Sequence, residues 1–198
     1  LYGLCLVNDW SARDIQAYEY QPLGPFLGKS FATSVSPWLV SLEALAPYRV
    51  AAPQQSPPVA DYLSTDEPWG FDLHLEVWLD TAEMRAAGQP AVRLSSVPFA
   101  DMYWTPAQQL AHMTVNGAAT NPGDLFASGT VSGPELGSEG SLIEMSWNGE
   151  RPIELPDGTR RAFLTDGDRV TLTGWAGTEP GDRIGLGSVT GTIEEMGA

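Results

Sequence analysis

Apolar and polar residues alternate along short stretches of this chain, and the clearest alternation runs from Phe71 to Asp80. Every second residue there is apolar and lines one face of a strand: Phe71, Leu73, Leu75, Val77 and Leu79. The positions between them carry polar side chains on the other face: Asp72, His74, Glu76 and Asp80. This pattern predicts an antiparallel strand with one face buried and the other in contact with solvent.

Turn residues divide the second half of the chain into short strands. Asn148-Gly149 separates two apolar runs, Leu142–Trp147 and Pro152–Leu155, and this dipeptide is the strongest short-range signal for a two-residue hairpin. Pro156–Gly158 and Thr165–Asp168 predict further turns, each followed by another strand-like run. The second half is therefore expected to form a β-meander or roll.

Two short helices are predicted. Thr105 precedes Pro106, and Gln108 follows three residues after Thr105, which is the pattern of a capping box with proline at the first helical position. That helix should end at Asn116-Gly117, and a second helix or single turn is expected after Ser11. Since 21 glycines and 16 prolines interrupt 198 residues, we expect a mostly β fold with a few short helices, arranged as a mixed β-roll or sandwich.

Charge and cysteine content narrow the possible partners and the compartment. The chain carries 25 acidic and 10 basic residues, a formal net charge of −15. This balance argues against binding nucleic acid or an anionic membrane surface, because both need clustered lysine and arginine. The single cysteine, Cys5, cannot form an intramolecular disulfide, so a reducing, cytoplasmic location is expected.

The first candidate site follows the apolar run Leu1–Val7. Asp9 stands at the end of this predicted strand, and in a helical turn Arg13 and Gln16 share a face, with Tyr20 one turn beyond. A carboxylate, a guanidinium and an amide aimed in one direction can bind a metal and an acidic substrate. The alternative is a helix N-cap with a local Asp–Arg ion pair.

Lys29 is the only lysine of the chain and lies between Gly28 and Ser30 in an apolar segment. Glycine allows the backbone to approach a ligand, and a lysine placed there can stabilise a developing oxyanion or pair with a carboxylate. The spacing from Gly24 is one residue short of a phosphate-binding loop, and an extended segment rather than a helix is expected next. Nucleotide binding is therefore not expected.

Two histidines offer weaker signals. Asp72, His74 and Glu76 alternate on one face of the predicted strand, and oxygen and nitrogen ligands at this spacing can converge on a metal. The alternative is the solvated face of an antiparallel strand. His112 falls inside the predicted helix, where a packing role is favoured over a role as a base.

A third segment combines a glycine, a hydroxyl and an acid. Gly129 precedes Thr130, an arrangement that can bring a hydroxyl against a substrate oxygen. Glu144 has apolar neighbours on both sides, and a carboxylate buried in such surroundings needs a partner, often a histidine or a metal. The alternative for Glu144 is an outward-facing strand position.

A series of motifs runs along the chain in this order: Asn8-Asp-Trp-Ser-Ala-Arg-Asp-Ile-Gln16, Pro22-Leu-Gly-Pro-Phe-Leu-Gly-Lys-Ser-Phe31, Ser36-Pro-Trp38, Ala127-Ser-Gly-Thr130 and Ser132-Gly-Pro-Glu135. Over essentially the whole chain they resemble the fumarylacetoacetase (fumarylacetoacetate hydrolase) family. The resemblance implies a homodimer and a metal-dependent hydrolysis of a carbon–carbon bond in a dicarboxylic β-diketone. That reaction converts 4-fumarylacetoacetate to fumarate and acetoacetate in tyrosine and phenylalanine breakdown.

The resemblance also implies a role for each matching residue. Arg13, Gln16 and Lys29 would stabilise the alkoxide and the departing carbanion, and Glu144 would orient the histidine that activates water. Gln16, Tyr20 and Thr130 would contact the substrate. The implied cofactors are Ca²⁺ and Mg²⁺, whose ligands would come from Asp9, for both ions, and from the main-chain oxygens of Lys29 and Thr33, for Mg²⁺.

Some groups that the resemblance implies match no residue of this sequence. They are the water-activating histidine, further carboxylate ligands and a substrate arginine, and neither His74 nor His112 fits the histidine motif. The chain also begins within a strand-like run and without an initiator methionine. We therefore expect residues 1–198 to be the carboxy-terminal portion of a single catalytic domain, inactive alone and a weak binder of calcium, which needs ~6–8 oxygen ligands.

Two other functions stay open at this point. The first is another hydrolase or decarboxylase of the same superfamily, acting on a different 2-oxo acid or β-dicarbonyl compound. The second is a non-catalytic β-rich binding module, since 7 tryptophans and many strands could suit a carbohydrate-binding sandwich.

Overall fold

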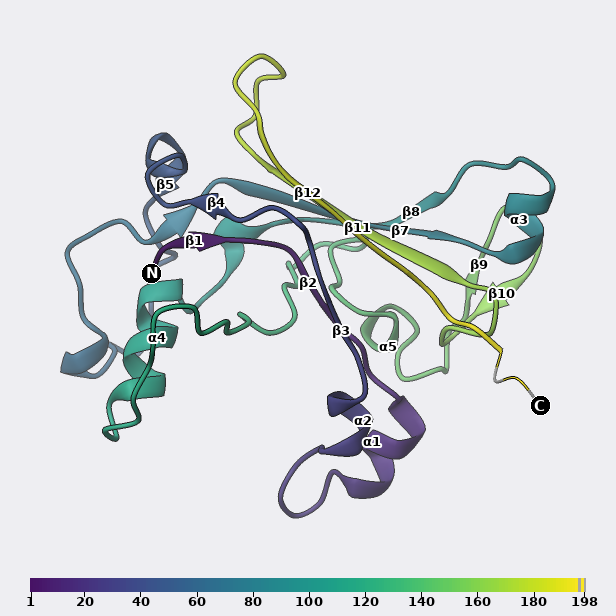
Figure 1. Ribbon diagram of the computed structural model, residues 1–198, viewed down its shortest axis with the longest axis horizontal. Helices are drawn as coiled ribbons and strands as arrows, with labels where there is room; N and C mark the ends of the chain where they lie inside the picture. The colour runs from purple at the N-terminus through teal and green to yellow at the C-terminus, as the bar shows by residue number, and fades with distance from the viewer. Residues whose placement is uncertain (196, 198) are drawn as a thin grey trace.

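The computed structural model describes residues 1–195 and 197, and a four-stranded antiparallel sheet lies at its centre. Its strands, in the order β12-β11-β7-β8, run side by side across the molecule (Figure 1). They are β7 (Leu73–Asp80), β8 (Val92–Pro98), β11 (Arg169–Ala176) and β12 (Ile184–Thr192).

The remaining strands form two-stranded antiparallel ladders around this sheet. They are β1 (Gly3–Leu4) with β4 (Val40–Ser41), β2 (Val7–Asp9) with β3 (Thr33–Val35), β5 (Arg49–Val50) with β6 (Gly70–Phe71), and β9 (Ile153–Glu154) with β10 (Arg160–Arg161). The molecule is thus rich in β-structure, which confirms the predicted fold class.

The helices are short. They are α1 (Arg13–Glu19), α2 (Leu27–Ser30), α3 (Ala82–Ala86), α4 (Pro106–Thr114) and α5 (Leu142–Met145), with the 3-10 turns Ala46–Tyr48, Asp61–Leu63 and Phe99–Asp101. Within residues 1–195 and 197, none of them has the length and apolar character needed to cross a membrane.

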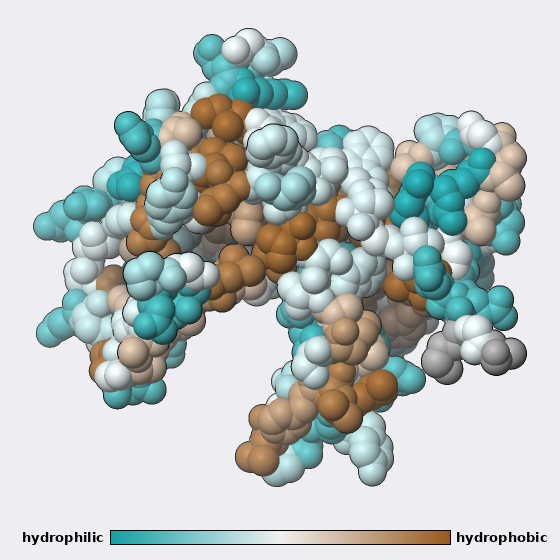
Figure 2. Space-filling view, in the orientation of Figure 1, coloured by the Kyte–Doolittle hydropathy of each residue, from teal (hydrophilic) through white to brown (hydrophobic). Residues whose placement is uncertain are grey.

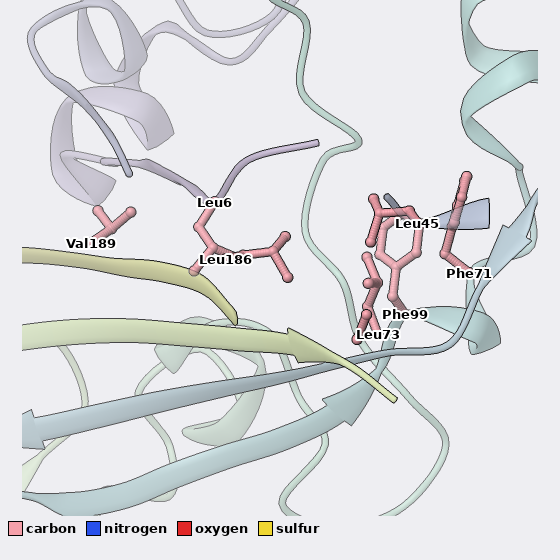
Figure 3. Close-up of a cluster of buried hydrophobic side chains, with 8 residues drawn as sticks. Leu6, Leu45, Phe71, Leu73, Phe99, Leu186 and Val189 are labelled. Atoms are coloured by element: carbon pink, nitrogen blue, oxygen red, sulfur yellow. The ribbon is translucent and has the colours of Figure 1, made fainter. Parts of the chain in front are cut away.

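Buried apolar side chains around the sheet form the main hydrophobic core. Its members are Leu6, Leu45, Phe71, Leu73, Phe99, Ala176, Leu186 and Val189. Leu6 lies beside Leu186 and Val189 of β12 (Figure 3), and burial of such a leucine contributes about 1.5–3 kcal/mol. Because Leu6 directly precedes β2, this contact holds the strand that ends at Asp9 against the sheet.

The strand expected at Phe71–Asp80 is confirmed, since β7 spans Leu73–Asp80 and buries Leu79 completely. The expectation that the polar face of this strand contacts solvent is wrong at Asp80, which is only 3% exposed. Its carboxylate pairs with Arg85 of α3 (Nη1–Oδ1 2.5 Å) and with Arg169 of β11 (Nη2–Oδ2 3.0 Å). Two cations on neighbouring elements therefore compensate the burial of this charge.

The helix predicted after Thr105 is confirmed as α4. The Thr105 hydroxyl accepts a hydrogen bond from the Gln108 N–H at 3.3 Å, and the Gln108 side-chain oxygen accepts one from the Thr105 N–H at 3.1 Å. These two bonds form the capping box that the sequence indicates. Gly117, with φ +89°, lies just beyond the helix end, in agreement with the predicted stop.

The hairpin predicted across Asn148-Gly149 is wrong, because Leu142–Met145 forms helix α5 instead of a strand. Trp147, Asn148 and Gly149 all have positive φ, at 50°, 55° and 90°. This backbone conformation serves a hairpin turn and a helix end equally well. Here the Asn148 N–H donates to the carbonyl of Ile143 at 2.8 Å, so the dipeptide ends a helix.

Asp157 lies in the turn of the β9–β10 hairpin and connects it to α3. Its Oδ1 accepts hydrogen bonds from the hydroxyl and the N–H of Thr159, at 2.6 and 2.9 Å, and its Oδ2 accepts one from the hydroxyl of Thr81, at 2.7 Å. The side-chain bonds from Thr159 and Thr81 lower the pKa of Asp157. Since Thr81 is the N-cap of α3, one carboxylate joins the two elements.

We expect Asp157→Asn to lower the free energy of unfolding near neutral pH and to lose this effect in acid. A carboxyl group whose folded pKa is depressed stabilises the protein above its unfolded pKa, about 3.9. That contribution disappears as the pH falls through the folded value. Urea denaturation of both proteins should show their stabilities converging below about pH 4. A difference that stays constant with pH would contradict this prediction.

Candidate active site

A large open cavity lies beneath the sheet, with a volume of about 1870 Å³. Figure 2 shows the molecule hollowed on this side, between the projection that carries α1 and α2 and the one that carries α4, with apolar side chains along the hollow. The sequence-predicted residues that line the cavity are Asp9, Arg13, Gln16, Tyr20, Lys29 and Thr130. The structure therefore brings most of the predicted site together, while Thr33 and Glu144 lie outside the lining.

The projection with α1 and α2 begins where β2 ends, at Asp9. Ala12 takes an extended conformation as the N-cap of α1 and donates its N–H to the carbonyl of Gly28 at 2.9 Å. The Glu19 carboxylate, at the end of α1, accepts hydrogen bonds from the N–H groups of Phe26, Leu27 and Gly28 at 2.7, 3.1 and 2.7 Å. The Glu19 side chain and one backbone hydrogen bond thus join the two helices.

Lys29 uses all of its hydrogen-bonding capacity inside this site. Its Nζ lies 2.7 Å from Asp9 Oδ2 and donates to the Asp9 carbonyl at 3.0 Å and to the Ser11 hydroxyl at 2.8 Å. The side chain is 27% exposed. The isolated lysine of the sequence is therefore a fixed, half-buried cation at the cavity wall rather than a mobile surface group.

Arg13 is the second cation of the cavity. Its Nη1 donates to the side-chain oxygen of Gln16 at 2.8 Å. Desolvation lowers the pKa of Arg13, while the charges of Glu144 and Asp9 act in the opposite direction. Asp9 forms its ion pair with Lys29, and the N-cap is Ala12, without a side-chain cap bond. The alternative of a simple capping acid paired with Arg13 is therefore wrong.

Glu144 lies on α5 near Arg13, in a setting that differs from the one expected. It is exposed and on a helix, instead of being enclosed by apolar residues or placed on a strand. Its carboxylate accepts hydrogen bonds from the hydroxyl of Ser132 at 3.0 Å, to both oxygens, and from the hydroxyl of Ser141 at 2.7 Å. The N–H of Gly140 donates to Ser132 Oγ at 3.0 Å, which directs the Ser132 proton toward Glu144.

Comparison with known proteins places this chain in a family. The model for the fumarylacetoacetate (FAA) hydrolase C-terminal region matches residues 1–194. The chain belongs to the fumarylacetoacetate hydrolase family. It is similar to the fumarylacetoacetase of Homo sapiens, with 50% identity over 193 residues, covering 98% of this chain and 45% of the human protein.

Other relatives agree with this assignment. The fumarylacetoacetase of Arabidopsis thaliana is 49% identical over 194 residues, covering 98% of this chain and 44% of the plant protein. That of Caenorhabditis elegans is 50% identical over 195 residues, covering 98% of this chain and 45% of the worm protein. The chain thus spans less than half the length of the curated relatives it matches.

The residues expected to hold metal in this family lie close together at the end of β2. Thr33 is the direct partner of Asp9 in the β2–β3 ladder, and Lys29 reaches Asp9 from α2. However, the described residues contain no group of three or more His, Cys, Asp or Glu side chains that could hold a metal ion. Asp9 fits one ligand position of a divalent cation, and calcium takes ~6–8 oxygen ligands.

Neither histidine joins the site of this family member. His74 lies 3.2 Å from Asp72 and stacks on Trp175, with ring centroids 5.6 Å apart, while Glu76 pairs with Arg93 at 2.8 Å. Asp72 and His74 are therefore neighbours, while Glu76 pairs elsewhere, and within the part of the chain that the structure describes the three side chains do not form a metal-binding group.

His112 also has a partner of its own, because its Nδ1 lies 3.0 Å from the Tyr62 hydroxyl. This contact fits the packing role that the sequence favours.

Four side chains of the site were not singled out from the sequence: Ser11, Glu19, Ser132 and Ser141. Each acts by hydrogen bonding to a predicted residue or to the backbone beside one. Ser11 and Ser132 lie within the motifs of the family resemblance, and Glu19 lies between the first two of them, which is a signal that could have found these residues. Ser141 lies outside those motifs and carries no comparable signal.

Proposed function

We propose that the protein containing this chain hydrolyses the carbon–carbon bond of 4-fumarylacetoacetate, giving fumarate and acetoacetate. The observation that carries this proposal is the fixed ammonium of Lys29, held by Asp9 and Ser11 at the wall of a cavity that also contains Arg13. In a chain of net charge −15, these two cations supply the local positive charge that a dicarboxylate substrate needs.

The chemistry of the reaction explains why such a site is needed. Water adds to a carbonyl carbon of the diketone, and the adjacent carbon–carbon bond then breaks, with its electron pair leaving as an enolate that a proton later neutralises. Both the alkoxide of the adduct and the enolate carry negative charge near the reacting carbons. Preorganised cations at this point lower the energy of both species, and we assign this role to Lys29 and Arg13.

The neighbouring polar residues have positions that suit substrate contacts. Gln16 is held by Arg13, and Tyr20 and Thr130 line the same cavity. We propose that these side chains bind the substrate oxygens. Glu144 is proposed to orient a histidine supplied from outside residues 1–198, with its own carboxylate held by Ser132 and Ser141.

We further propose that residues 1–198 are the carboxy-terminal portion of one catalytic domain. Support comes from the relatives, since the chain corresponds to 45% of the human protein, and from Asp9, the only carboxylate that the resemblance assigns to the metal site here. On this proposal the remaining carboxylates and the water-activating histidine lie elsewhere in the complete protein, a homodimer in the cytoplasm. Ca²⁺ and Mg²⁺ are the proposed ions.

A direct assay of the complete protein tests the reaction. Incubation with 4-fumarylacetoacetate should release fumarate and acetoacetate in equal amounts, measured by chromatography. Acylpyruvates and 2-oxo acids serve as competing substrates. Faster turnover of an acylpyruvate, or release of carbon dioxide from a 2-oxo acid without fumarate formation, would assign the site to another reaction of the superfamily.

Metal dependence gives a second prediction. A divalent ion, when bound, polarises substrate oxygens as a Lewis acid, so chelation should abolish turnover of the complete protein and added Ca²⁺ or Mg²⁺ should restore it. Because Asp9 is a single carboxylate ligand, calorimetric titration of residues 1–198 alone should show only weak calcium binding. Tight stoichiometric binding by this chain would contradict the proposed division of ligands.

A further inference from the structure

The contact between α1 and α2 determines the position of the Lys29 backbone. Four hydrogen bonds from backbone N–H groups make this contact, and we call it the α1–α2 clasp. The N–H groups of Phe26, Leu27 and Gly28 donate to the Glu19 carboxylate, and the N–H of Ala12 donates to the carbonyl of Gly28. Lys29 is the next residue after Gly28. The clasp therefore fixes the backbone from which the only lysine side chain extends.

Gly28 permits this contact because it has no side chain. A Cβ atom at Gly28 would lie 2.7 Å from the backbone nitrogen of Gln16, 3.0 Å from its Cα and 3.1 Å from the carbonyl oxygen of Ala12. All of these atoms belong to the backbone, so no rotamer change can relieve the clash. A larger residue would have to separate the helix that carries Arg13 and Gln16 from the turn that carries Lys29.

Glu19 contributes a feature that a neutral side chain cannot copy. Its two carboxylate oxygens receive three N–H donors, and although desolvation acts to raise its pKa, the bonds from Gly28, Phe26 and Leu27 lower the pKa of Glu19 overall. Glutamine has one acceptor oxygen and would place an NH₂ group against N–H donors. Exchange of Glu19 for glutamine should therefore open the clasp without changing the size of the side chain.

We propose that Glu19 and Gly28 are positioning residues of this site, which place the Lys29 ammonium against Asp9 and Ser11. Lysine has a flexible four-carbon stem, and its Nζ can meet three acceptors at once only when its backbone is held. The catalytic consequence of this placement rests on the proposed function, whereas the placement itself can be measured independently.

The first measurement is the acylation rate of Lys29 in the complete protein. An N-hydroxysuccinimide acetate reagent modifies the amine, and mass spectrometry quantifies the peptide that contains Lys29. In Glu19→Gln and in Gly28→Ala, the released Lys29 side chain should lose its proton to solvent more readily and, as the neutral amine, be acylated roughly three- to tenfold faster, the factor expected for losing one hydrogen bond. Two variants acting on opposite sides of the clasp keep the test decisive if Gly28→Ala does not fold.

Asp157→Asn is the matched control. Asp157 is also an acid with a pKa lowered by hydrogen bonds, but it joins β9–β10 to α3, away from α1 and α2 (Figure 1). This variant should lose stability while its Lys29 acylation rate stays unchanged. An acylation rate within twofold of wild type in Glu19→Gln and Gly28→Ala, or an equal increase in Asp157→Asn, would overturn the positioning role.

Turnover separates this proposal from the proposed function. In Glu19→Gln we expect kcat to fall about tenfold with KM changed less than threefold, because a displaced cation stabilises the charged reaction species poorly. If Lys29 becomes more reactive while kcat stays at the wild-type value, the placement by Glu19 is upheld and the catalytic role proposed for Lys29 is what fails.

Discussion

Replacement of Lys29 by methionine is expected to reduce kcat/KM of the complete protein by roughly 10²–10³-fold, the effect of removing one preorganised oxyanion-stabilising donor. Methionine is unbranched and only one atom shorter than lysine, but it lacks the ammonium that meets Asp9 and Ser11. Steady-state kinetics of fumarate release measures the effect. Circular dichroism should show an intact fold, because Lys29 is 27% exposed and its loss creates no large cavity.

Arg160→Met provides the control for loss of positive charge. Arg160 is an exposed residue of β10, so its replacement changes the net charge equally without touching the cavity. We expect kcat/KM to stay within about twofold of wild type, since an exposed charge distant from the site is largely screened. Equal turnover in Lys29→Met and wild type would show that Lys29 has no role in the reaction. That result would favour a binding role for this β-rich chain.

The sequence is a reliable guide where structure depends on neighbouring residues. The helix at α4 follows from Thr105, Pro106 and Gln108, which lie within four positions and satisfy one another. Strand β7 follows from a simple alternation. In both cases the information that selects the structure lies inside the element itself.

Prediction fails where a distant residue decides between two local structures. Asn148-Gly149 favours positive φ and is compatible with a hairpin or with a helix end. The segment before it becomes α5, whose Glu144 is bound by Ser132, twelve residues away. Asp80 is buried for a similar reason, because Arg169 reaches it from a strand 89 residues further along the chain.

In the candidate site too, features set by neighbouring residues are predictable from the sequence, and contacts between distant residues are not. A single lysine in an apolar loop marks Lys29 as a candidate site residue, and the local pattern places Arg13 and Gln16 on one helix face. The partner of Lys29 is Asp9, twenty residues earlier, and the contact depends on how α2 folds back against β2. Sequence spacing alone does not indicate that α2 folds back against β2, so the Lys29–Asp9 ion pair is seen only in the three-dimensional structure.

Replacement of the buried acid Asp168 by alanine is expected to lower the free energy of unfolding by about 3–5 kcal/mol. Asp168 is completely buried, and its carboxylate accepts hydrogen bonds from Arg161 Nε and Nη2 at 2.8 and 3.0 Å and from the N–H of Thr165 at 2.9 Å. The bond to Asp168 raises the pKa of Arg161. Alanine would leave that guanidinium, only 12% exposed, without its partner.

Asp166→Ala is the matched control for Asp168→Ala, because Asp166 lies in the same turn and is exposed. Its replacement should change stability by less than about 0.5 kcal/mol, as is usual for a surface position. Urea denaturation at neutral pH measures both variants against wild type. A loss below about 1 kcal/mol in Asp168→Ala would show that water solvates Arg161 once the carboxylate is gone. The ion pair would then hold the β10–β11 turn in place without adding to global stability.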